Sequence, residues 1–206
     1  MSLSPEHLAD LKNSGLSDET IAMMGVYSMP PLELKRFLES DTPAIESALA
    51  FPYYNAAKAP LIVDGKPFLR VKIFPPIKNQ NGGTVKYLQK KNSGSHLYIL
   101  PLVASELESH QTPLYIVEGE KKTAKAVELG LAAIGISGVW NWLKKNSSDA
   151  IDDFNQINFW RRQVFIVPDS DTFDQDEKAT HLRRAVFALC KEIKARGASV
   201  KVVSLM

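Results

Sequence analysis

The stretch Leu114-Tyr-Ile-Val-Glu118-Gly119-Glu-Lys-Lys122-Thr-Ala-Lys-Ala-Val-Glu-Leu-Gly130 decides the fold of this chain. Its first residues form a short apolar run that ends on an acid, which predicts a buried strand over 114–117. Gly119 permits a turn, and the residues after it favour a helix that Gly130 ends. The stretch therefore predicts a strand, a tight turn and a helix, with Glu118 at the carboxyl end of the strand.

A second stretch repeats this plan. Val164-Phe-Ile-Val-Pro168 is another short apolar run, and Asp169-Ser170-Asp171 follows it directly. Further strands are expected over 132–136 and 199–204, and helices over 120–129, about 150–158 and 178–196. Because strands and helices alternate at these lengths, we expect right-handed crossovers and a mainly parallel α/β sheet with helices on both faces.

The first half of the chain has a different composition. Residues 1–50 carry 3 basic and 8 acidic residues and resemble a set of short helices, whereas residues 51–110 carry 8 basic and 3 acidic residues. Strand patterns dominate the second of these segments, with expected strands at 61–63, 68–74, 84–88 and 97–100. We therefore predict a helical N-terminal segment (1–50), a basic β-rich subdomain (51–110) and an α/β domain (111–206).

The basic subdomain is a candidate nucleic-acid surface. Arg70 and Lys72 alternate with apolar residues, and Lys86-Tyr87 lies in the next predicted strand. Lysines and arginines interleaved with tyrosine suit backbone phosphates and stacked bases. An ordinary half-exposed sheet with its lysines in solvent would give the same pattern, so both interpretations stay open at this point.

Composition excludes several other classes. With 206 residues, 45% hydrophobic content and a net charge of +2, the chain can bury a core. No apolar run approaches the roughly 20 residues of a membrane helix, and no secretion signal is visible, so we expect a cytoplasmic protein without membrane contact. The only cysteine, Cys190, is expected in the core, and the four histidines lack the spacing of a zinc site.

Three carboxylates follow the two apolar strands. If these strands are neighbours, Glu118 meets Asp169 and Asp171 at one edge of the sheet, where ligands of open parallel sheets gather. Two carboxylates about 4 Å apart repel by roughly 4 kcal/mol, so the cluster favours a bound cation. Oxygen ligands without cysteine or histidine indicate Mg²⁺ or Mn²⁺. A helix-terminal acid and a loop cap would look the same in sequence.

The combination of these motifs resembles the Toprim family. An apolar strand ending in Glu118-Gly119, then a helix, a strand and Asp169-x-Asp171, is similar to the core shared by DnaG-type primases, topoisomerases and some nucleases. Phe51 to Tyr53, Lys86-Tyr87 and Glu118 to Lys122 extend the likeness to nearly the whole chain. The pattern is most similar to the Toprim-containing, DUF-type domain near the N-terminus of phage and plasmid primase-helicase proteins, which are replication proteins of mobile elements.

This resemblance implies DNA primase activity, a nucleotidyltransferase reaction. Glu118, Asp169 and Asp171 would be the catalytic and metal-binding residues, with Mg²⁺ or Mn²⁺ as cofactor. Single-stranded DNA and nucleotides would be the partners, together with a helicase in the same polypeptide or complex. Phosphate and nucleic-acid contacts would come from a set of basic and aromatic residues: Arg70, Lys72, Lys86, Tyr87, Lys121 and Lys122.

One departure from the primase pattern keeps two alternatives open. DnaG-type primases carry an acid four residues after the motif glutamate, and Lys122 occupies that position here. The isolated chain would then be inactive, as a Toprim-like DNA-binding module of a replication helicase or primase. A Toprim nuclease is the second alternative, because nucleases of this family use similar carboxylates.

Overall fold

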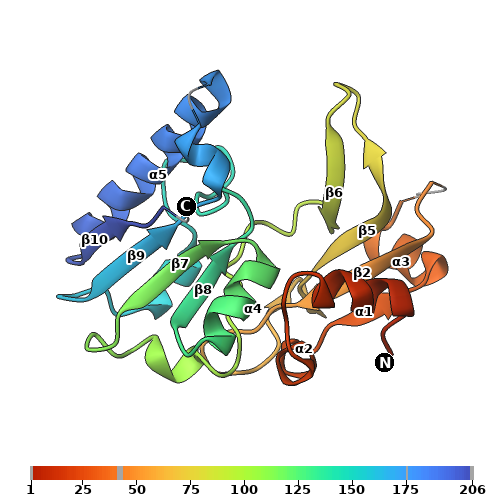
Figure 1. The fold of residues 1–206 in the computed structure, drawn as a ribbon, viewed down its shortest axis with the longest axis horizontal. Coiled ribbons are helices and arrows are strands. Elements are labelled where there is room, and N and C mark those ends of the chain that lie inside the picture. Colours follow the sequence, from red (N-terminus) through yellow and green to blue (C-terminus); the bar gives the residue numbers. More distant parts are fainter. Residues whose placement is uncertain (1, 41–43, 175, 205–206) are drawn as a thin grey trace. The chain divides into compact units, whose positions relative to one another are not determined.

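The structure is a computed structural model that describes residues 2–40, 44–174 and 176–204 (Figure 1). The chain folds as two compact units. One comprises residues 1–53 and 60–93, and the other comprises residues 54–59 and 94–206. The division of the chain at residues 50 and 110 stays a prediction.

The second unit contains the predicted parallel sheet. Its order is β10-β9-β7-β8, and every neighbouring pair is parallel. Figure 1 shows the four strands side by side. The elements are β7 (Leu114–Glu118), α4 (Glu120–Glu128), β8 (Ala132–Ile136), β9 (Gln163–Val167), α5 (Glu177–Ala195) and β10 (Ser199–Val202). The predicted α/β fold is therefore confirmed, with most element bounds within two residues of those expected.

Alternation along the strands places the two helices on opposite faces of this sheet. Ile116 and Ile166 line a small cavity with Leu189 of α5, which covers that face. On the other face, a Cβ at Gly135 would lie 2.7 Å from the Thr123 hydroxyl of α4. Glycine is therefore required here, because the helix approaches the strand backbone too closely for any side chain.

Two elements of this unit differ from the sequence expectation. Leu97–Leu100 is fully buried but is not a regular strand, since only Tyr98 forms an isolated bridge, to Gly135. The helix expected near 150–158 is a 3₁₀ turn, η2 (Asp152–Gln156); another, η1 (Ala104–Glu106), precedes β7. The buried apolar residues of both segments have a spacing that looks regular in the sequence, but backbone pairing decides the assignment.

The first unit is built on an antiparallel sheet of order β1-β2-β5-β6. Its elements are α1 (Pro5–Lys12), α2 (Asp18–Met24), β1 (Tyr27–Met29), α3 (Pro31–Leu38), β2 (Ser47–Pro52), β5 (Leu69–Lys78) and β6 (Thr84–Gln89), with a separate hairpin of β3 (Ile62–Val63) and β4 (Lys66–Pro67). The N-terminal segment, which was predicted to be helical, contributes three helices and also the strand β1 and most of the strand β2, which its pattern did not predict. The order of elements in this unit, short helices and then basic strands, agrees with the helical segment and β-rich subdomain that the fold prediction included.

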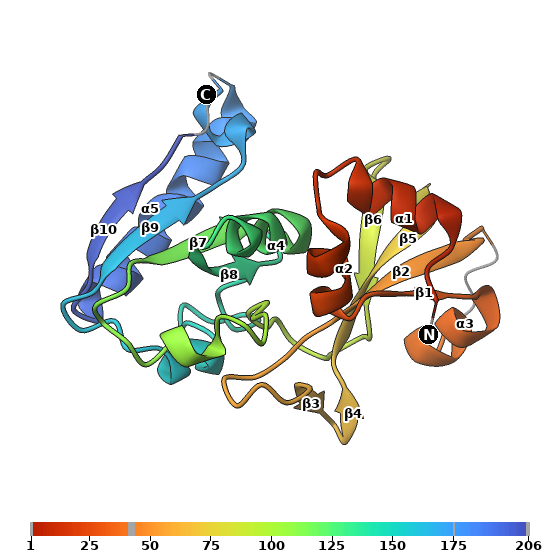
Figure 2. The ribbon, with the colours of Figure 1, turned by 60° about the horizontal axis from the view of Figure 1, so that its bottom comes forward.

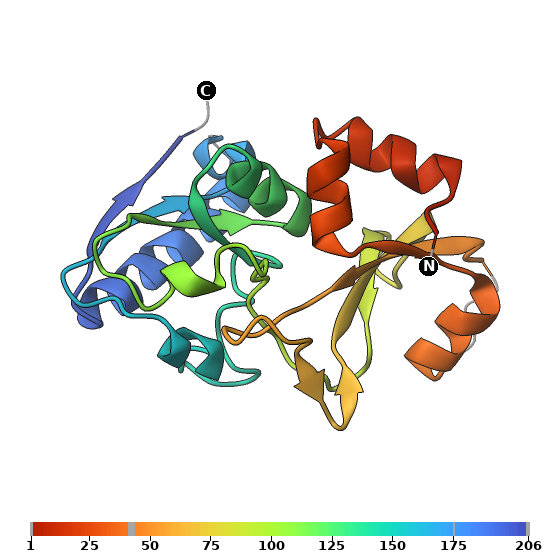
Figure 3. The ribbon, with the colours of Figure 1, turned by 90° about the horizontal axis from the view of Figure 1, so that it is seen from below.

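The helices of this unit also cover opposite faces of their sheet. Leu34 and Leu38 of α3 pack in one core with Val71 and Ile73 of β5. Asp10 of α1 forms an ion pair with Lys72, which points to the other face because side chains alternate along a strand. Figures 2 and 3 show α1 and α3 on the two sides of the sheet.

Two smaller expectations concern the thiol and membrane contact. Cys190 is half-buried on α5, and burial raises the pKa of its thiol. Within the described ranges, no helix combines the length and the apolar character that crossing a membrane requires.

Candidate functional site

The candidate site lies at the carboxyl edge of the parallel sheet. Strands β7 and β9 are neighbours, with Val117 opposite Val167. Glu118 ends β7, and Asp169 follows β9 immediately before the 3₁₀ turn η3 (Ser170–Phe173), which contains Asp171. The structure therefore brings Glu118 and Asp169 to the same edge, as their spacing in the sequence suggested.

The turn at Gly119 fixes the direction in which Glu118 leaves the strand. Gly119 has φ 93° and ψ 149°, a backbone conformation that is essentially restricted to glycine. Its N–H donates to the carbonyl of Ile136 at 2.8 Å, and its carbonyl accepts from the Thr123 hydroxyl at 2.8 Å. The turn is thus held from β8 on one side and from α4 on the other.

The carboxyl group of Glu118 is in an unfavourable environment for an anion. Burial raises its pKa, and the charges of Asp169 and Asp171 raise it further, while a hydrogen bond from the Asp169 backbone and the charge of Lys122 act in the opposite direction. Its Oε2 atom is buried and has no hydrogen-bond partner among the described residues. A buried carboxylate oxygen without a partner costs free energy unless a cation or a donor reaches it.

Lys122 is the cation at this edge. Its ammonium group forms an ion pair with Asp169, and both side chains are about half exposed, at 52% and 41%. Lys122 stands on α4, four residues after Glu118, so one turn of helix places it beside the strand ends. The residue that departs from the primase pattern therefore contacts one of the predicted metal ligands.

The described residues at this edge have the chemistry of a divalent-cation site but not a three-ligand geometry. Among the described residues, no three His, Cys, Asp or Glu side chains converge closely enough to hold a metal ion. The donor chemistry is nevertheless that of Mg²⁺ or Mn²⁺, because Glu118 offers an unpartnered carboxylate oxygen and Asp169 faces it from the neighbouring strand. Asp169 becomes available to a metal once its ion pair with Lys122 opens.

Thr172 is a polar residue of the site that the sequence did not single out. Its hydroxyl is buried without a hydrogen-bond partner among the described residues, and its N–H donates to the Asp169 carbonyl at 3.0 Å. Arg183 of α5 donates to the Thr172 carbonyl at 3.3 Å and to that of Asp174 at 2.7 Å, which ties η3 to the helix. In the sequence, a threonine after two aspartates is indistinguishable from an ordinary loop residue.

The predicted nucleic-acid residues of the first unit are divided between two faces of its sheet. The Arg70 guanidinium lies 5.0 Å from the centre of the Tyr87 ring, and Lys72 is ion-paired with Asp10. Because Lys72 pairs in register with Tyr87, the adjacent residue Lys86 points to the opposite face, where it is exposed. The structure therefore brings Arg70, Lys72 and Tyr87 together but separates them from Lys86.

Together these observations define a mixed α/β fold, in which a parallel four-stranded sheet flanked by helices follows an antiparallel sheet with basic strands. Solved structures with the same fold include the DnaG catalytic core, at a TM-score of 0.59 and 18% identity over 99% of this chain and 66% of that one. The zinc-binding and RNA polymerase domains of the Aquifex aeolicus primase align at 0.65 and 13% identity, over 98% and 50%. The RNA polymerase domain of Mycobacterium tuberculosis DnaG aligns at 0.61 and 14% identity, over 98% and 71%.

The chain thus has a primase-like fold and spans between half and about seven tenths of these primase chains. The profile of a family described as Domain of unknown function (DUF3854) matches residues 105–206. No curated protein sequence matches the chain.

Proposed function

We propose that this chain is the Toprim primase-like domain of a phage, plasmid or other mobile-element replication protein, which binds single-stranded DNA and a divalent metal for primer synthesis. The observation that carries the proposal is the buried Oε2 of Glu118, which has no hydrogen-bond partner in the described part of the chain and lies at the edge where Asp169 follows the neighbouring strand. The primase-like fold supports it, because these carboxylates lie at the ligand-binding edge of the sheet.

In this proposal, Glu118, Asp169 and Asp171 would hold the metal, which requires the three carboxylates to move closer together than the structure places them. Mg²⁺ or Mn²⁺ held there would supply the positive charge needed to position nucleotide phosphates and to lower the pKa of an attacking hydroxyl. Burial of the Glu118 carboxyl disfavours its anionic form, so a cation at this edge would relieve the cost of ionising it. Lys121 and Lys122, on the first turn of α4, would contact the phosphates that arrive with the metal.

Metal binding can be measured directly. We expect Mn²⁺ to bind the wild-type chain weakly, because protein carboxylates would fill only part of its coordination shell. Binding should be lost when Asp169 and Asp171 are both changed to Ala. The matched control is Asp174→Ala, since Asp174 lies just beyond η3 and serves Arg183 through its backbone carbonyl. Equal Mn²⁺ heats in wild type and the double variant would refute the metal assignment.

We also propose that the basic strands of the first unit contact the DNA backbone. Arg70 with Tyr87 offers a cation and a ring on one face, and the exposed Lys86 offers a cation on the other. Lys72 contributes less than its sequence position suggested, because it is only 15% exposed in its ion pair with Asp10.

The salt dependence of DNA binding tests these contacts. Each phosphate contact contributes about −0.7 to the slope of log affinity against log salt for single strands. Lys86→Ala should flatten the slope by about that amount, and Arg70→Ala should do the same. Lys145→Ala is the control, since Lys145 is exposed in the other unit. If all three variants keep the wild-type slope, the DNA runs elsewhere.

An inert DNA-binding module is the second candidate function. The ion pair between Lys122 and Asp169 favours it, since a lysine at this position neutralises a ligand that the metal requires. A Toprim nuclease would be revealed by incubating the chain with single-stranded DNA and Mn²⁺, because the DNA would then be shortened. In either case, a helicase in the same polypeptide or complex would share the bound single strand with this domain.

A further inference from the structure

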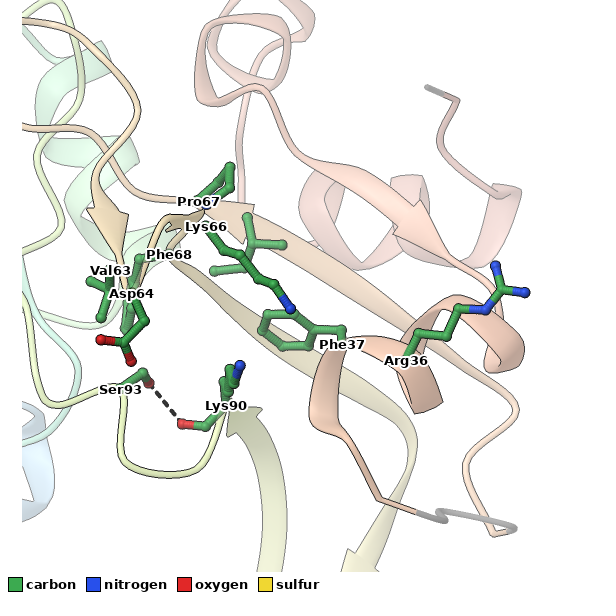
Figure 4. A pocket seen from close by; sticks show the side chains of 10 residues that line it. Arg36, Phe37, Val63, Asp64, Lys66, Pro67, Phe68, Lys90 and Ser93 are labelled. Atoms are coloured by element: carbon green, nitrogen blue, oxygen red, sulfur yellow. Dashed lines mark hydrogen bonds between the residues drawn. The ribbon is translucent and has the colours of Figure 1, made fainter.

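The first unit contains a pocket that neither the carboxylate edge nor the basic strands account for. It lies between the end of α3, the β3–β4 hairpin and the turn after β6, and it has a volume of about 60 Å³ (Figure 4). Its lining combines apolar residues with Arg36, Lys66, Lys90 and Asp64. Since one water needs roughly 15 Å³ of such space, the pocket has room for one small polar group.

Two of the charged lining residues, Lys66 and Lys90, have their ammonium groups close to the pocket (Figure 4). Figure 4 shows the ammonium groups of Lys66 and Lys90 on the side of Phe37, whereas the Arg36 guanidinium points away. The carboxylate of Asp64 is directed toward Ser93 instead. The two lysines therefore set the charge near Phe37, and Lys90 is the more shielded of the two, with 29% of its side chain exposed against 69% for Lys66.

The walls of the pocket are formed by backbone turns of defined geometry. Asp64 and Gly65 both have positive φ in the two-residue turn of the β3–β4 hairpin, as a tight hairpin requires. On the opposite side, the Ser93 hydroxyl donates to the Lys90 carbonyl at 2.7 Å and accepts from the Gln89 side chain at 3.2 Å. Lys66 and Lys90 thus emerge from two short, constrained segments, which limits the entropy lost when they bind a ligand.

An acid of the protein already bridges the two lysines. Glu39 accepts a hydrogen bond from Lys90 at 2.7 Å and lies 3.7 Å from Lys66. It ends α3 in the left-handed conformation, with φ 54°, which is strained for a residue other than glycine. The hydrogen bond and charge of Lys90, followed by the charge of Lys66, lower the pKa of Glu39. A carboxylate oxygen of Glu39 therefore lies between the two ammonium groups, although the backbone of Glu39 adopts an unfavourable conformation.

We propose that this pocket is a binding site for a phosphate monoester, carried by a free nucleotide or by the 5′ end of a nucleic-acid strand, and that the phosphate competes with Glu39, outside the pocket, for the ammonium groups of Lys66 and Lys90. A phosphate carries more charge and more acceptor oxygens than a carboxylate, so it competes favourably for two lysines. Arg36 lines both this pocket and a wider hollow formed with Leu32, Lys35, Glu39 and Ser40. The inference does not rest on primer synthesis or on the metal site.

Calorimetry with inorganic phosphate tests the site on the full chain. Lys90→Ala should weaken phosphate binding by about fivefold or more, and Glu39→Gln should strengthen it about three- to fivefold, because the competing ion pair is of the exposed kind. Lys91→Ala is the matched control, since Lys91 is the exposed neighbour that does not line the pocket. Unchanged melting temperatures establish that each variant is folded, and Lys90→Gln replaces Lys90→Ala if the latter is not.

Two further arms distinguish the source of the phosphate. A mononucleotide is compared with a short oligonucleotide bearing either a 5′-phosphate or a 5′-hydroxyl, and the ligand whose affinity falls in Lys90→Ala identifies the source. Equal phosphate binding by wild type, Lys90→Ala and Glu39→Gln would overturn the proposal. Mn²⁺ titration of the same variants should match wild type, so a failure of this site and a failure of the metal site give different results.

Discussion

Replacing Arg162 by Met is expected to lower the free energy of unfolding of the second unit by about 3 kcal/mol or more, because several buried carbonyls would lose their donor together. Arg162 is fully buried. Its guanidinium donates to the carbonyls of Thr112 at 2.8 Å, Glu106 at 2.8 Å and Leu107 at 3.2 Å, and more weakly to that of Asn158 at 3.5 Å. Met preserves much of the apolar stem, so the loss reports the hydrogen bonds rather than a cavity.

The neighbouring arginine provides the control. Arg161 is exposed and has φ 57°, which Met would have to adopt equally, so Arg161→Met should change stability by no more than about 0.5 kcal/mol. Urea unfolding measures both variants, and hydrogen exchange of residues 106–112 shows whether the segment before β7 loosens first. A change below about 1 kcal/mol in Arg162→Met would mean that water replaces the guanidinium at these carbonyls.

Arg162 also marks a limit of sequence interpretation. The pair Arg161-Arg162 looks like a basic surface in sequence, since arginine is rarely buried without a carboxylate partner. Here the carbonyls of a distant segment accept the hydrogen bonds of the guanidinium. Burial lowers the pKa of Arg162, and the charge of Glu106 acts in the opposite direction. Nothing in the local pattern around residue 162 specifies those carbonyls.

The elements that were predicted well are those whose signal is local. Strands β7, β8 and β9 are continuous apolar runs bounded by turn residues, and the stretch from Leu114 to Gly130 fixed a strand, a turn and a helix in order. The candidate carboxylates followed from the same signal, because parallel neighbours must end at one edge. The register of neighbouring strands was harder to predict from the sequence. That Lys86 and Lys72 lie on opposite faces depends on how β5 pairs with β6, and this pairing is irregular between Lys72 and Ile77.

Substitutions of Lys122 are expected to have the second largest effect, on the affinity of the carboxylate edge for Mn²⁺. Lys122→Met should tighten Mn²⁺ binding by about tenfold, because it removes a cation and releases Asp169 from its ion pair. Lys122→Asp should tighten it further by adding an acid where DnaG-type primases carry one. Lys125→Met is the matched control, since Lys125 makes a comparable ion pair, with Glu128, on the same helix.

The same variants separate an active primase from an inert module. With Lys122 in place, a second metal lacks a ligand and meets a positive charge, so we expect little or no primer synthesis by the unmodified chain while DNA binding persists. Incubation with single-stranded template, nucleotides and Mn²⁺, followed by gel electrophoresis, measures this, and Lys122→Asp should raise any residual synthesis. Robust primers from the unmodified chain, together with fewer primers from Lys122→Met, would instead assign Lys122 to a substrate phosphate. In that case one metal suffices, and the ion pair with Asp169 is a resting contact that substrate opens.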